Sequence, residues 1–118
     1  MDQLSQDLQR TIEFIETHPW TKGALARRKY SPKEKASPAT SPFSSNANSF
    51  CLLGAAMRAN NLRVPAQRLI AIDDAVFAEA GRDAHRYNDF VAKDKRYVIR
   101  LLKRIIQKNS CGVSSSHM

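Results

Sequence analysis

Phe50-Cys51-Leu52-Leu53-Gly54-Ala55-Ala56-Met57 is the most apolar stretch of this 118-residue chain, and it decides the fold that we predict. Asn46, Asn48 and Ser49 precede it, and side chains of these types accept hydrogen bonds from the free N–H groups of a first helical turn. The stretch therefore predicts a short helix over residues 49 to about 60. Because this helix is apolar on every side and carries small residues, we expect the other helices to pack around it.

Three further segments show the apolar periodicity of amphipathic helices. The first covers residues 3–17, with Asp2 as its expected cap. The second covers residues 65–80, and its predicted apolar stripe consists of Leu69, Ile72, Val76 and Phe77. The third begins after Asp94 and runs to about Lys108, with aliphatic residues on one face and basic residues largely on the other.

The rest of the chain shows no strong periodicity. Residues 31–49 are rich in Ser and Pro and contain only Phe43 as an apolar anchor, so we expect a mobile loop. Residues 109–118 are expected to form a disordered tail. Since no strand-like alternation exceeds four residues, we predict an all-α, single-domain bundle of four to five helices over residues 1–108, around the short central apolar helix.

The composition excludes several classes of protein. No run approaches the roughly 20 apolar residues that span a bilayer, and the N-terminus lacks the basic start and apolar run of a secretion signal. We therefore expect a cytoplasmic protein without a membrane partner. Cys51 and Cys111 lie in different surroundings, and no Cys or His pair has the spacing of a zinc site. This predicts free thiols and no metal or other cofactor.

The net charge of +8 is the unusual feature of the composition, and its excess lies in two blocks, residues 20–35 and 93–108. A basic helix face presents side chains at intervals suited to phosphates, and Tyr30 adds an aromatic ring for stacking on a base. The pattern predicts a small non-catalytic protein that binds nucleic acid or an acidic protein surface. A solvated charged face is the simpler alternative. The predicted partner-binding residues are Arg27, Arg28, Lys29, Lys33, Lys35, Lys95, Arg96, Arg100, Lys103 and Arg104.

Cys51 is the best candidate for an active residue, because free N–H groups and the helix dipole at a first helical turn stabilise a thiolate. With His85 as the base and Asn88 as the orienting residue, the chain contains in order the residue types of a thiol-dependent hydrolase or transferase. The simpler alternative makes Cys51 a small core residue and places His85 on a solvated turn. Asn88 and Asp89 then serve as a turn or capping pair before the last helix.

Three motifs follow one another along the chain: Trp20-Thr21-x-Gly23 with Ala26-Arg27, Phe50-Cys51-x-x-Gly54-Ala55, and Tyr87-Asn88-Asp89. Together with the last helix, they resemble a family of short proteins of bacteria and their phages that has no assigned activity. Tyr87 stands where a Trp is usual in that family, and the Ser/Pro-rich residues replace a shorter link. The resemblance implies, through a phage or mobile-element setting, a small protein that binds host machinery and interferes with it.

Overall fold

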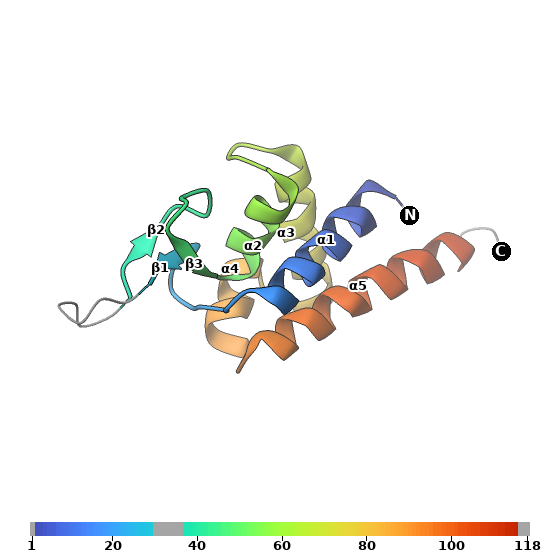
Figure 1. The fold of residues 1–118 in the computed structure, drawn as a ribbon. Helices are drawn as coiled ribbons and strands as arrows, with labels where there is room; N and C mark the ends of the chain where they lie inside the picture. Colours follow the sequence, from blue (N-terminus) through green and yellow to red (C-terminus); the bar gives the residue numbers. More distant parts are fainter. Residues whose placement is uncertain (1, 30–36, 116–118) are drawn as a thin grey trace.

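The computed structural model describes residues 2–29 and 37–115, with side chains described as far as Ser110 (Figure 1). Tyr30, Lys33 and Lys35 therefore lie outside the described residues. The elements in chain order are α1 (Gln3–Thr17), β1 (Ala26–Arg28), β2 (Ala39–Thr40), β3 (Ala47–Phe50), α2 (Leu52–Asn60), α3 (Gln67–Ala80), α4 (Ala84–Arg86), the π-helix η1 (Tyr87–Val91) and α5 (Lys95–Ser115).

The all-α prediction is wrong, because a three-stranded antiparallel sheet in the order β2-β1-β3 lies at one end of the helices (Figure 1). Ala26 in the central strand pairs with Thr40 on one side and with Phe50 on the other. Strands of two to four residues are too short to show a recognisable alternation in the sequence. Two of them, β2 and β3, occupy part of the segment 31–49 that we predicted as a loop.

The predicted central helix is confirmed as α2, although its start is corrected. Leu52, Ala55 and Ala56 are fully buried, and α2 contacts α1, α3 and α4. The cap is Cys51, whose side chain accepts from the Gly54 N–H. The three polar residues that we expected to cap this helix fall within or just before strand β3, where they cannot reach the first turn of α2.

The amphipathic helices follow the predictions with local differences. The bounds of α1 and its Asp2 cap are confirmed, with Asp2 Oδ1 accepting from the Ser5 N–H at 2.8 Å. In α3, the predicted stripe is buried except for Phe77, which is 59% exposed. The Asp94 side chain accepts from the Arg96 N–H at 2.8 Å at the start of α5, which continues past Lys108 to Ser115. α1 and α3 both pack against α5 and place its basic face outward.

Candidate functional site: a buried polar junction and a basic helix face

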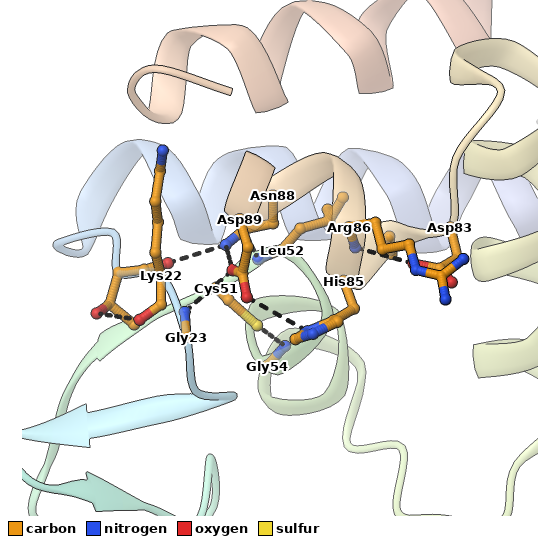
Figure 2. A network of polar contacts seen from close by, with 12 residues as sticks. Lys22, Gly23, Cys51, Leu52, Gly54, Asp83, His85, Arg86, Asn88 and Asp89 are labelled. Carbon is orange, nitrogen blue, oxygen red and sulfur yellow. Dashed lines mark hydrogen bonds and ion pairs between the residues drawn. The ribbon is translucent and has the colours of Figure 1, made fainter. Parts of the chain in front are cut away.

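Asn88 lies at the centre of a buried polar junction that joins three parts of the chain (Figure 2). Its Oδ1 accepts from Trp20 Nε1 at 2.7 Å and from the Leu52 N–H at 3.0 Å. Its Nδ2 donates to the Thr21 carbonyl oxygen and to Asp89 Oδ1, both at 3.0 Å. An amide side chain has two N–H donors and two acceptor lone pairs, so the hydrogen-bonding capacity of Asn88 is fully used.

The π-helical geometry of η1 brings two consecutive side chains to the same segment. The Ala92 N–H donates to the Tyr87 carbonyl oxygen at 2.9 Å, which closes the wide turn. Within that turn Asn88 contacts Trp20, and Asp89 Oδ1 accepts from the Gly23 N–H at 3.0 Å. Gly23 has a φ of 78°, a left-handed conformation that glycine adopts at little cost. Asn88 and Asp89, predicted as a turn or capping pair before the last helix, lie in the wide turn of η1, and the side chain that caps α5 is that of Asp94.

Arg27 holds the other end of the Trp20–Arg27 segment. Its Nε donates to Thr21 Oγ1 at 3.0 Å, its Nη2 donates to the Lys22 carbonyl oxygen at 2.9 Å, and its Nη1 donates to the Ser37 carbonyl oxygen at 2.9 Å. The guanidinium thus binds the turn 21–22 and the chain that leads into β2. This use of Arg27 stabilises the fold and leaves few of its donors for a partner.

Gly54 permits the closest approach of two backbone segments in the junction. A Cβ atom added at this position would lie 1.8 Å from the Leu25 carbonyl oxygen. That oxygen also accepts from the Cys51 N–H at 3.1 Å, so the first turn of α2 is attached directly to the segment before β1. The first two motifs of the sequence therefore meet here, and Asn88 brings in the third.

Cys51, His85 and Asp89 lie in the same part of the junction (Figure 2). His85 Nδ1 lies 3.5 Å from Asp89 Oδ2, and the His85 side chain is 66% exposed. Cys51 is 4% exposed, and burial raises the pKa of its thiol, as does the negative charge of Asp89, against backbone hydrogen bonds that lower it. Among the described side chains, no hydrogen bond joins Cys51 to His85. The arrangement keeps the thiol neutral instead of activating it.

The described members of the predicted basic set lie in two separate places, on and just after the central strand β1 and on α5 (Figure 1). Arg28 is half-buried and Lys29 is exposed at the end of β1. Lys95 is turned inward, where its Nζ donates to the carbonyl oxygens of Ile15 at 3.2 Å and His18 at 3.3 Å. It therefore caps the C-terminus of α1, a position where a cation is stabilised by the helix dipole.

Five exposed cations remain along the outer side of α5, and we call this row the basic ridge: Arg96, Arg100, Lys103, Arg104 and Lys108. Two carboxylates of the described chain face it. Asp94 pairs with Arg96 at 2.8 Å, and Glu79 pairs with Arg104 at 3.5 Å and with Lys108 at 3.0 Å. Hydrogen bonds from these partners hold the pKa of both carboxyl groups below their usual values.

A cavity of about 470 Å³ opens beside the ridge, between α3, η1 and α5. Its lining residues are Glu79, Ala80, Tyr87, Val91, Tyr97, Arg100 and Arg104. The Arg100 guanidinium lies 5.2 Å from the centre of the Tyr97 ring, and Tyr87 Oη donates to the Tyr97 carbonyl oxygen at 3.2 Å. Sequence reasoning missed this cavity, because its residues come from three elements whose relative placement no local pattern reveals.

The chain belongs to the family of unknown function DUF6197, whose model matches residues 1–108. This confirms a resemblance to a family without an assigned activity. No curated protein and no solved structure matches the chain. Within residues 2–29 and 37–115, no helix combines the length and apolar character that crossing a membrane requires. In the same ranges, no cluster of His, Cys, Asp and Glu side chains is suited to hold a metal ion.

Proposed function

We propose that this is a non-catalytic, cytoplasmic protein that binds nucleic acid through the basic ridge of α5. The observation that carries the proposal is the spacing of the cations. Arg96, Arg100, Arg104 and Lys108 follow one another at four-residue steps, so successive side chains rise by about 6 Å along the helix. An exposed row of cations at regular intervals suits the regularly spaced phosphates of a nucleic-acid backbone.

The charge balance of the ridge supports this choice over an acidic protein surface. Five cations face two carboxylates, and Arg100 and Lys103 have no carboxylate partner in the described part of the chain. The excess charge is extended along the helix and is not gathered around one point, which matches a polyanion better than a single acidic side chain. In the phage or mobile-element setting that the sequence resemblance implies, such binding would interfere with host machinery.

Thiol-dependent catalysis with Cys51, His85 and Asn88 has less support. Asn88 has no free donor or acceptor left to orient the imidazole, although Asp89 lies near enough to do so. The thiol itself is buried and has a raised pKa, which is the opposite of what a nucleophilic cysteine requires. We therefore favour the ridge as the working surface.

Fluorescence anisotropy with labelled DNA and RNA tests the proposal. We expect binding that weakens steeply between about 50 and 200 mM salt, with a slope of log affinity against log salt of about −0.7 for each phosphate contact to a single strand. The double variant Arg100→Glu with Lys103→Glu should weaken binding more than tenfold and lower the slope by about 1.4, since two contacts are removed.

The matched control is Arg63→Glu, which makes one of the same charge changes in the connection between α2 and α3, on the other side of the helices from α5 (Figure 1). It should leave binding nearly unchanged. Absent or salt-independent binding would contradict the proposal. Ridge-dependent binding of polyglutamate without binding of nucleic acid would replace it by an acidic protein partner.

A further inference from the structure

The cavity and the basic ridge form one continuous surface, because Arg100 and Arg104 belong to both. The cavity volume of about 470 Å³ lies within the range of small-molecule sites. Its walls combine two tyrosine rings with the apolar side chains of Ala80 and Val91. A ligand in this position would have the cations of the ridge on one side and aromatic surface on the other.

The lining groups match the parts of a nucleotide. Guanidinium groups such as that of Arg104 bind phosphate oxygens in pairs, and the partly exposed ring of Tyr97 offers aromatic surface for a planar base, whereas Tyr87 is buried and forms the floor. The Arg100 guanidinium already lies over the Tyr97 ring, which leaves a cationic, planar surface at the mouth of the cavity. Glu79 supplies a carboxylate that is 13% exposed and can accept a hydrogen bond from an exocyclic amino group.

We propose that this cavity holds one unpaired nucleotide of a single strand that lies along the basic ridge. The inference rests on the proposed function and narrows it, because a base inside a duplex is stacked and paired and cannot enter a cavity without leaving the helix. The ligand class is therefore single-stranded nucleic acid, with its phosphates on the ridge and one base in the cavity.

Phe90 provides an independent observation in favour of a single strand. Its side chain is 73% exposed, next to Val91, which lines the cavity. Large exposed aromatic side chains beside a cationic groove are the stacking platforms of proteins that bind single strands. Phe90 sits on η1, which the Asn88 hydrogen bonds attach to the body of the protein, so the backbone that carries this ring is fixed before a ligand arrives.

The test compares the affinities of the full chain for a labelled single strand, for the duplex of the same sequence and for a free mononucleotide. We expect the single strand to bind at least tenfold more tightly than the duplex. Phe90→Ala should weaken single-strand binding by about 5- to 150-fold, as removal of a stacking side chain does, without changing the salt slope. Ala80→Leu fills the cavity at constant charge and should have the same selective effect.

Phe77→Ala is the matched control, since Phe77 is also an exposed phenylalanine, is 59% exposed and does not line the cavity. It should leave both affinities unchanged, and thermal unfolding should show that all three variants are folded.

If no nucleic acid binds even at low salt, the proposed function itself fails. If binding is salt-dependent but single strand and duplex bind equally and Phe90→Ala has no effect, only the single-strand inference is overturned. Tight binding of the free mononucleotide, lost in Ala80→Leu, without preference for the single strand, would also overturn it.

Discussion

The Asn88 junction and the basic ridge are both built from polar side chains, and they differ in where the partners of those side chains lie. In the junction, Asn88 is fully buried and finds all its partners within the chain, on half-buried Trp20 and Thr21 and on buried Leu52. On the ridge, five cations share two carboxylates and face solvent. The comparison shows that residue types suited to catalysis can serve structure when the fold already satisfies their bonding capacity.

The same distinction separates cations that look equivalent in the sequence. Lys95 and Lys103 both belong to the basic block before and within α5, but Lys95 caps α1 whereas Lys103 has no partner among the described residues. Arg27 and Arg100 differ in the same way, because Arg27 binds the turn before β1. Burial and existing partners, more than residue type, therefore select the residues available to a ligand.

The largest effect is expected from breaking the junction at its centre. Asn88→Ala leaves Trp20 Nε1, the Leu52 N–H and the Thr21 carbonyl oxygen without their partner, and each buried unsatisfied group costs about 1–3 kcal/mol. We expect the free energy of unfolding to fall by about 4 kcal/mol, measured by urea denaturation. The control Asn48→Ala changes an exposed residue of β3 and should cost less than about 0.5 kcal/mol. An unchanged midpoint for Asn88→Ala would show that the junction does not stabilise the fold.

Gly54→Ala tests the contact between the first turn of α2 and the segment before β1. Because the new Cβ would lie 1.8 Å from the Leu25 carbonyl oxygen, backbone must move, and we expect a loss of about 3 kcal/mol in urea unfolding. Gly81→Ala is the comparison, since Gly81 has a φ of 75° but no atom within 4 Å of an added Cβ. It should cost only the backbone strain, about 1 kcal/mol. Equal losses for the two variants would argue against the close approach at Gly54.

Alkylation of Cys51 tests whether the thiol in the junction is buried and unreactive. In a Cys111→Ser background, burial and the raised pKa of Cys51 should make labelling by iodoacetamide near pH 8 about 100-fold slower in the native protein than in urea, which corresponds to about 2.7 kcal/mol. The raised pKa of Cys51 also makes the stability of the fold depend on pH. The native state holds the Cys51 thiol proton to higher pH than the unfolded chain does. The resulting contribution to the free energy of unfolding is therefore fully present below the thiol pKa of the unfolded chain and declines as the pH rises above that value. Rapid labelling near pH 6 would instead reveal an activated thiolate and revive the catalytic alternative.

Lys95→Met should show the smallest effect and separates structural from binding cations. Removal of the ammonium group takes hydrogen-bond donors from the C-terminus of α1, and we expect a loss of about 1 kcal/mol in the free energy of unfolding. Nucleic-acid affinity should change less than twofold. The Arg100→Glu and Lys103→Glu double variant should show the reverse pattern, with stability unchanged and affinity lost. A strong loss of affinity in Lys95→Met would mean that Lys95 leaves α1 to reach the ligand.

Sequence patterns predicted the parts of the fold that depend on neighbours along the chain. The repeat of Leu8, Ile12 and Ile15 and the cap at Asp2 predict α1 correctly, and the apolar run from Phe50 to Met57 predicts the buried helix, although three residues too early. The sheet was missed because its strands have two to four residues and depend on partners elsewhere in the chain. Phe77 was predicted in the apolar stripe, but it lies about 100° around the helix from Val76 and falls outside the packed face, which continues to Ala80.

The candidate sites show the same limit. The ridge residues of α5 could be predicted because one helix brings them together. The cavity beside the ridge needs Glu79, Tyr87 and Tyr97 from three elements, and no local signal marked it. The junction was visible as three ordered motifs, but their meaning as one hydrogen-bonded unit required the distance between Trp20 and Asn88.

Trp20 and Asn88 are 68 positions apart, and this separation has a consequence for synthesis on the ribosome. At about 5–20 residues per second, the ribosome adds Asn88 several seconds after Trp20. During that time the Trp20 indole N–H lacks its hydrogen-bond acceptor. Until Asn88 is made, the sheet end of the nascent protein is held to α2 by contacts such as the Cys51 N–H to Leu25 carbonyl hydrogen bond, but it lacks the contact to η1. A truncated product that ends before η1 lacks both Asn88 and α5, so we expect proteases to cleave it faster than the full chain.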